Sequence, residues 1–128
     1  MSGGENLQKK LQGELEKYQA AQKDLQKYLS ARQQLDAQLN ENNMVKDELE
    51  KLEKGENVFK LIGPVLVKQE LTEAKQNVQK RIEYITSEVK RHDNTIKDLE
   101  KTQESHRENL TKLQLQFQQA QVKAAARS

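Results

Sequence analysis

The chain has 128 residues, of which 33% are charged, 34% are hydrophobic and 4% are aromatic. Such a chain has too few apolar side chains for a compact globular core, which leaves either disorder or long helices with a narrow apolar seam. Acidic and basic residues interleave to a net charge of +2 and cysteine is absent, which excludes a basic arm for nucleic acid, disulfides and thiolate chemistry.

The N-terminal segment, about residues 6–54, is predicted to be a coiled-coil helix. Within 18–39 the apolar steps alternate three and four residues once Arg32 is counted, which is the heptad pattern of a coiled coil. Lys54 followed by Gly55 is typical of a helix C-terminus and its cap. We assign these residues to the seam: Leu7, Leu11, Leu15, Tyr18, Ala21, Leu25, Tyr28, Leu35, Leu39, Val45, Leu49 and Leu52.

The next segment, about residues 56–68, predicts a β-hairpin, because two short β-prone runs flank the pair Gly63-Pro64. Side chains alternate between the two faces of a strand, and here both faces are largely apolar. A lone hairpin with two unpaired edges is only marginally stable in water. We therefore expect it to join strands of other chains, in a closed barrel. The alternative is an apolar loop packed against the helices. The candidate assembly residues are Val58, Phe59, Leu61, Ile62, Val65, Leu66 and Val67.

The C-terminal segment, about residues 70–122, continues the heptad alternation from Val78 without a slip, and the chain ends outside the two helices are expected to be disordered. Folded back, it pairs antiparallel with the first helix, so that residues whose numbers sum to about 124 become neighbours. Polar residues in a seam usually set its register. These residues are Arg32, His92, Gln103 and His106.

A metal or catalytic site built on the two histidines is excluded by their spacing. His92 and His106 lie fourteen residues apart on one helix, roughly 21 Å along its axis. They cannot share an ion, and no Ser, Cys or carboxylate forms a catalytic constellation with either. We therefore expect no enzyme activity, no metal and no cofactor.

Four stretches carry a resemblance to a known family: "QKKLQGELEKYQ" (8–19), "ENNMVKDEL" (41–49), "VFKLIGPVLVKQEL" (58–71) and "RIEYITSEVKR" (81–91). Over nearly its whole length the chain resembles the beta-type subunits of prefoldin, with the hairpin as the most specific part. The implied fold is mainly α. It is a single domain over residues 1–128, a long antiparallel two-helix coiled-coil hairpin whose central β-hairpin joins an intersubunit β-barrel.

The resemblance also implies a function. Prefoldin is a heterohexameric, ATP-independent co-chaperone of the cytosol that captures unfolded proteins, such as actin and tubulin, and transfers them to the cytosolic chaperonin. The implied partners are other alpha- and beta-type prefoldin subunits, unfolded clients and that chaperonin, with no nucleic acid and no membrane. The sequence shows no signal-like apolar run and no stretch long enough to cross a bilayer, which favours a cytoplasmic location, with the nucleus as a further site.

In that family, clients are held near the helix ends that lie away from the β-barrel. The candidates here are Leu7, Leu11, Leu113, Leu115, Phe117 and Val122. Leu115 and Val122 fall at the outward heptad position f. The alternative for these two is that they are ordinary surface residues without a binding role. For the whole chain the alternative function is a coiled-coil tether or scaffold, which does not need an apolar hairpin.

Overall fold

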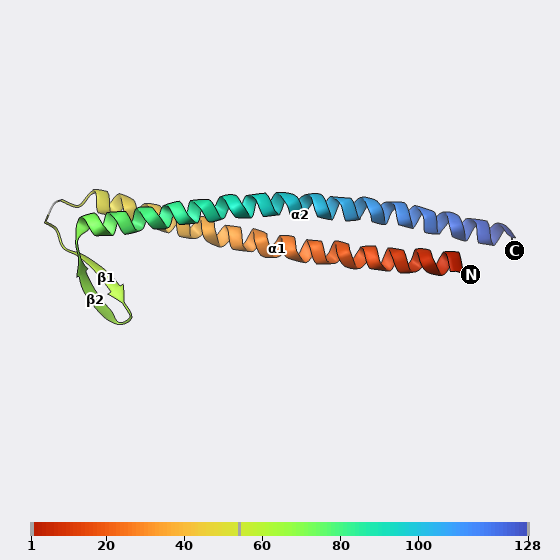
Figure 1. Cartoon of the computed structure of the whole chain (residues 1–128), viewed down its shortest axis with the longest axis horizontal. Coiled ribbons are helices and arrows are strands. Elements are labelled where there is room, and N and C mark those ends of the chain that lie inside the picture. Colours follow the sequence, from red (N-terminus) through yellow and green to blue (C-terminus); the bar gives the residue numbers. More distant parts are fainter. Residues whose placement is uncertain (1, 54, 128) are drawn as a thin grey trace. The chain divides into compact units, whose positions relative to one another are not determined.

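The computed structural model describes residues 2–53 and 55–127, and within them the chain is mainly helical with a central antiparallel β-hairpin (Figure 1). This is the predicted fold class. The elements, in chain order, are α1 (Ser2–Glu50), β1 (Val58–Ile62), β2 (Val65–Gln69) and α2 (Leu71–Arg127).

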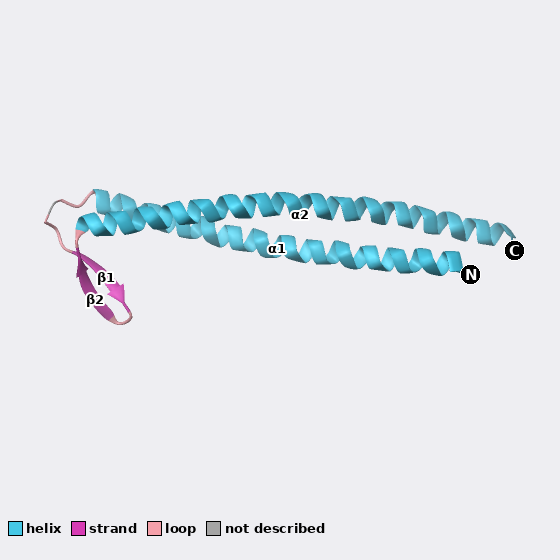
Figure 2. Ribbon diagram, viewed as in Figure 1, coloured by secondary structure: helices cyan, strands magenta, loops and turns pink. Residues whose placement is uncertain are grey.

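The described residues group into two compact units, and both helices contribute to each. The first unit contains residues 2–29 and 94–127, and the second contains residues 30–53 and 55–93 with the hairpin (Figure 2). In each unit a segment of α1 lies beside a segment of α2 that runs in the opposite direction. Low-numbered positions of one helix therefore meet high-numbered positions of the other, as antiparallel pairing requires.

The seam of α2 follows the predicted alternation of four and three residues. Val78, Ile85 and Ile96 are buried, whereas Ala124, at the end of the pattern, is exposed. The half-buried positions between them are Ile82, Val89, His92, Leu99, Gln103, His106, Leu110, Leu113, Phe117 and Ala120. A strict heptad therefore continues through the polar residues of this helix as well as the apolar ones.

The seam of α1 departs from the prediction at two places. Leu15 and Val45 are 37% and 46% exposed, while Glu14, Asn42 and Lys46 are at least half-buried. These three residues continue the alternation outward from 18–39, because a regular helix keeps the same face toward its partner. At Leu15 and at Val45 the prediction took the nearest apolar residue, whereas the polar neighbour occupies the seam position. Tyr28 keeps its place in the alternation, but it is 38% exposed and not buried as a seam residue was expected to be.

The end of α1 also differs from the prediction, since the helix ends at Glu50 and not near residue 54. The amide of Leu52 donates to the carbonyl oxygen of Leu49 at 3.2 Å, an i→i−3 bond that tightens the last turn. Gly55 has a φ of 102° but lies in the connection beyond the helix. Lys54 is outside the described residues.

This tight turn brings the chain onto the core of the second unit. The core consists of Leu49, Ala74 and Val78, each less than a tenth exposed. The partly buried side chains packed around it are Leu52, Val58, Leu71 and Ile82. The base of the hairpin is thus attached to the helices through Val58.

Helix extends further toward both chain ends than the expected bounds of 6 and 122. α1 begins at Ser2 and α2 continues to Arg127, where we expected disorder. Once a helix is nucleated, each further residue adds a hydrogen bond, and three alanines at 124–126 have the highest helix propensity. Met1 and Ser128 are outside the described residues.

Candidate functional site

The hairpin forms at the predicted residues. β1 and β2 pair antiparallel, with Val58 opposite Gln69 at the base and Ile62 opposite Val65 at the turn. Gly63 has a φ of 57° at the first position of the two-residue turn, a conformation that glycine adopts without the steric penalty of a Cβ. The Gly63-Pro64 pair therefore makes the reversal, as the sequence predicted.

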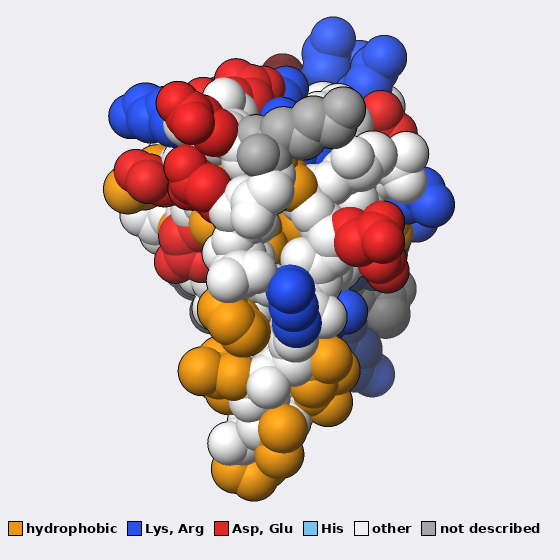
Figure 3. Space-filling view, turned by 90° about the vertical axis from the view of Figure 1, so that its left-hand side faces the viewer, with side chains coloured by type: hydrophobic (Ala, Val, Ile, Leu, Met, Phe, Trp, Pro, Cys, Tyr) orange, Lys and Arg blue, Asp and Glu red, His pale blue; other side chains and the backbone are white. Residues whose placement is uncertain are grey.

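Both faces of the hairpin carry exposed apolar side chains. Residues opposite each other share a face, so Ile62, Val65 and Val67 lie on one face, and Phe59, Leu61 and Leu66 lie on the other. Their exposed fractions range from 42% for Val67 to 66% for Leu61 and Leu66. Figure 3 shows hydrophobic side chains gathered over the projecting hairpin. The alternative of a loop packed on the helices is wrong, because only Val58 of the candidate residues contacts the core.

The hairpin also leaves backbone groups without strand partners. Among the described residues the sheet has two strands, so β1 and β2 each have a single neighbour. The outer edge of each strand presents N–H and C=O groups that can pair with another strand. Chemically, the hairpin can accept a strand on either side and apolar side chains on either face.

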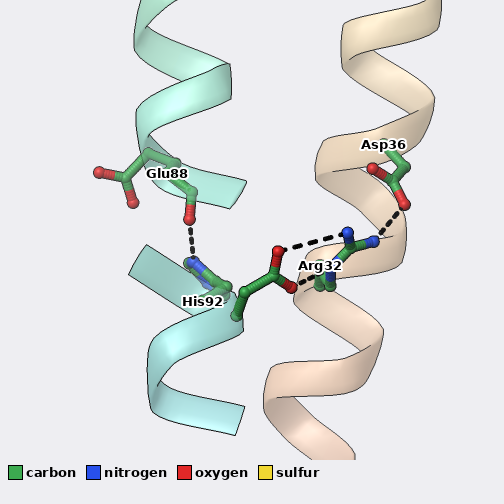
Figure 4. Close-up of polar contacts among 5 residues, drawn as sticks. Arg32, Asp36, Glu88 and His92 are labelled. Atoms are coloured by element: carbon green, nitrogen blue, oxygen red, sulfur yellow. Dashed lines mark hydrogen bonds and ion pairs between the residues drawn. The ribbon is translucent and has the colours of Figure 1, made fainter. Parts of the chain in front are cut away.

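A polar layer joins the helices in the second unit (Figure 4). Nε of Arg32 in α1 donates to Oδ1 of Asp93 in α2, and its Nη1 donates to Oδ2 of Asp36 at 2.5 Å. These contacts raise the pKa of Arg32, first through the hydrogen bond to Asp93 and then through the charge of Asp36. Residues 32 and 93 sum to 125, so the predicted register of about 124 is confirmed in this unit.

His92 was predicted to lie near Arg32 and occupies the same layer. Its Nδ1 lies 2.8 Å from the carbonyl oxygen of Glu88, one turn earlier in α2. A carbonyl oxygen only accepts, so Nδ1 carries the proton. The bond that joins α1 to α2 here is made by the next residue, Asp93, which the sequence reasoning missed.

A second polar layer lies in the first unit. Nδ1 of His106 donates to Oε1 of Glu14, and Nδ2 of Asn109 donates to the same oxygen at 3.1 Å. The Glu14 side chain is 12% exposed and that of His106 is 21% exposed. The hydrogen bonds from His106 and then Asn109 lower the pKa of Glu14 and favour its ionised form.

Glu14 was absent from the sequence-based candidates. We expected Tyr18 opposite His106, but the bonded residue lies one turn earlier in α1. Counting four residues back from Tyr18 in the heptad would have found Glu14, because that step leads to the seam whatever the residue type. Gln103, the remaining polar seam candidate, is half-buried in the same unit.

The client-binding candidates all belong to the first unit and fall into two groups. Leu7, Leu11, Leu113 and Phe117 are half-buried in the seam. Leu115 and Val122 are 55% and 68% exposed, as expected of position f. Apolar surface thus occurs near the described chain ends as well as on the hairpin.

Metal binding and membrane insertion are two other kinds of function to consider for the described residues. No group of three or more His, Cys, Asp or Glu side chains within 2–53 and 55–127 is arranged to hold a metal ion. No helix in that part of the chain is both long and apolar enough to cross a membrane.

Comparison with known proteins identifies a family. Residues 6–117 match the family described as "Prefoldin subunit". "Prefoldin subunit 6" of Canis lupus familiaris is 57% identical over 124 residues, 97% of this chain and 96% of the relative. "Prefoldin subunit 6" of Homo sapiens is 58% identical over 121 residues, 94% of each chain. The quoted stretches resemble subunit 6 of eukaryotes in particular, and these relatives confirm that resemblance.

A solved structure gives the same answer for the fold. The crystal structure of the prefoldin beta subunit from Thermococcus strain KS-1 superposes with a TM-score of 0.58 at 25% sequence identity. The match covers 87% of this chain and 91% of that chain. The predicted beta-type fold, with helices on either side of a central hairpin, is therefore confirmed.

Proposed function

The chain belongs to the prefoldin family of chaperone subunits, and we propose that it is one beta-type member of an ATP-independent heterohexamer. This complex captures unfolded proteins, actin and tubulin among them, and transfers them to the cytosolic chaperonin. The single observation that carries the proposal is a paired hairpin whose two faces and two edges are open.

The hairpin is the proposed assembly element. Six exposed apolar side chains on two short strands are costly in water. Burying them between chains gives, at roughly 25 cal/mol per Å², on the order of 10 kcal/mol of gross stabilisation. Lost association entropy offsets a good part of this. Neighbouring subunits would supply the missing strands and close a barrel without edges.

The first unit is the proposed client-binding region. Capture of many different unfolded chains needs apolar surface that is accessible and binds each partner weakly. Leu115 and Val122 are apolar and directly accessible. The half-buried seam residues Leu7, Leu11, Leu113 and Phe117 would contribute where the helix ends open locally.

The polar seam residues have a proposed role in register. An apolar seam alone tolerates slippage by a heptad, whereas a polar residue is stable only opposite its partner. Arg32 with Asp93 and His106 with Glu14 are two such pairs. Gln103 and His92 would act in the same way within their layers.

The remaining features of the proposal follow from family membership. The chain acts as a single domain over residues 1–128, without enzyme activity, nucleic-acid partner or membrane partner. Its location is the cytoplasm, with the nucleus as a further site. A coiled-coil tether or scaffold is the competing function, and it leaves the open hairpin unexplained.

Affinity purification at native expression separates the two functions. The co-chaperone proposal predicts that five other prefoldin subunits co-purify with this chain in one complex. Recovery of a monomer or a symmetric dimer of this chain, with no other prefoldin subunit, would support the tether and reject the proposal.

A further inference from the structure

A groove in the first unit has a composition that the proposed function does not explain. It has a volume of about 390 Å³ and is lined by Lys10, Gly13, Glu14, Lys17, Asn109 and Leu113. This volume lies toward the lower end of the range for ligand sites, roughly 300–1,000 Å³. The groove therefore has room for a few side chains of a partner, but not for a folded domain.

Position 13, which lines the groove, has no side chain. Gly13 lies within α1, and a Cβ built there would meet nothing within 4 Å. Glycine inside a helix is destabilising relative to alanine, so the residue weakens the helix without making room for any packed neighbour. What it leaves open is the space beside Leu113.

The charges around this space favour an acidic occupant. Lys10 and Lys17 line the groove and are both exposed. Its one carboxylate, Glu14, is already bonded to His106 and Asn109 and is largely buried. The accessible charge is thus positive, and Leu113 contributes an apolar side chain to the lining.

We propose that this groove binds an extended, unfolded client segment in which apolar side chains lie between two carboxylates. The inference rests on the proposed client-binding function and adds a chemical preference to it. Lys10 and Lys17 are seven residues apart, roughly 10 Å along a helix. Two carboxylates four residues apart on an extended chain lie on the same face, roughly 13 Å apart, and the flexible lysine side chains can reach both. An acidic residue, three apolar residues and a second acidic residue therefore match the groove, with the middle apolar residue on the same face as the two carboxylates.

The test uses the assembled complex that contains this chain, with a synthetic nonapeptide as the probe. The peptide has three central leucines flanked by aspartates, and the middle leucine is replaced by a photo-crosslinking residue. Cross-linked sites are mapped by mass spectrometry, which separates this chain from the other subunits. We expect cross-links at residues 10–17 and 109–113, weakened severalfold at high salt because exposed ion pairs are screened.

Gly13→Leu is the decisive variant. It fills the groove and replaces a weak helix former with a strong one, so the helix is kept. We expect about a tenfold loss of peptide affinity and of cross-linking to this chain. The matched control is Gln19→Leu, which adds the same side chain at an exposed position that does not line the groove.

The charge preference is tested separately. Lys10→Gln with Lys17→Gln should weaken binding by about two- to fivefold per lysine, in the range of exposed ion pairs. Lys9→Gln, at an exposed lysine outside the groove, should not. A peptide with lysines in place of the aspartates should bind the wild-type complex no better than one whose leucines are replaced by serine.

The outcomes separate this inference from the function it rests on. If the wild-type complex captures unfolded protein but Gly13→Leu retains full peptide binding and cross-linking, the groove inference is overturned and the proposed function stands. If the wild-type complex captures no unfolded protein at all, both fail. Loss of peptide binding in Gly13→Leu, with general capture retained through the other subunits, supports the groove.

Discussion

The helix seam and the hairpin distribute polar and apolar groups in opposite ways. In the seam, charged residues such as Glu14 and Arg32 occupy interior heptad positions, and each is bonded to a residue of the facing helix. In the hairpin, side chains such as Leu61 and Leu66 are two-thirds exposed. These charged groups of the seam therefore find bonding partners within one chain, whereas the apolar side chains of the hairpin are left exposed.

This contrast indicates which part of the molecule requires a partner. A polar layer inside a coil costs stability but is complete once its hydrogen bonds form. An apolar two-stranded sheet with open edges is incomplete by itself, because two strands alone are marginal in water. Changes in the seam should therefore affect this chain, and changes in the hairpin should affect the assembly.

The largest expected effect is at the hairpin. Phe59→Asp or Ile62→Asp should abolish incorporation into the complex, because a carboxylate would have to be buried between chains. Helix content by circular dichroism should remain that of the wild type. Asn57→Asp, outside the strands, is the control. Sizing chromatography that still shows the substituted subunits in the complex would contradict the assembly role.

The seam should give the opposite result. Leu49→Ala removes buried apolar volume from the core of the second unit and should lower the free energy of unfolding by about 2–3 kcal/mol. Met44→Ala, at a 67% exposed position of the same helix, should change it by less than about 0.5 kcal/mol. Equal urea midpoints for the two variants would mean that the seam is not the stabilising element.

Removal of residues 115–128 should affect function without affecting assembly. It deletes Leu115, Phe117 and Val122 and leaves the hairpin unchanged, so the complex should form but suppress client aggregation severalfold less well. Removal of residues 123–128 alone is the control and should have little effect. Light scattering of an aggregating denatured client measures the suppression by each truncated form. Equal suppression by the two forms would show that Leu115, Phe117 and Val122 do not take part in client binding.

The smallest expected effect is a pH dependence from Glu14. Its pKa is lowered from 4.5 by the hydrogen bonds of His106 and then Asn109, with a smaller contribution from the charge of Lys17. A lowered folded-state pKa adds stability that is present above pH 4.5 and is lost as the pH falls below it. Glu14→Gln should therefore lose less thermal stability between pH 6 and 3 than the wild type. Glu16→Gln, at an exposed position, should retain the wild-type slope.

Sequence reasoning predicted the fold well because the fold depends on local periodicity. The heptads of 18–39 and of α2, and the Gly63-Pro64 turn, each follow from a few neighbouring residues. The errors arose where a polar residue takes a seam position and an apolar neighbour is available. Glu14 beside Leu15 is one case, and Lys46 beside Val45 is the other.

Such positions depend on the facing helix, which a scan of one helix does not include. Glu14 is stable in the seam because His106 and Asn109 donate to it from α2. The groove at Gly13 was also missed, since an isolated glycine in a helical pattern says nothing about the side chains across from it. Only the three-dimensional register brings Lys10, Gly13 and Leu113 together.

Hydrogen–deuterium exchange tests the central claim most directly, by comparing this chain alone with the same chain in the complex. We predict that the amides of β1 and β2 exchange rapidly in the isolated chain and at least about a hundredfold more slowly in the complex. Seam amides around Leu49 and Ile85 should change far less. Equal exchange of the hairpin amides in the two states would contradict the account, because the hairpin would then gain no partner on assembly.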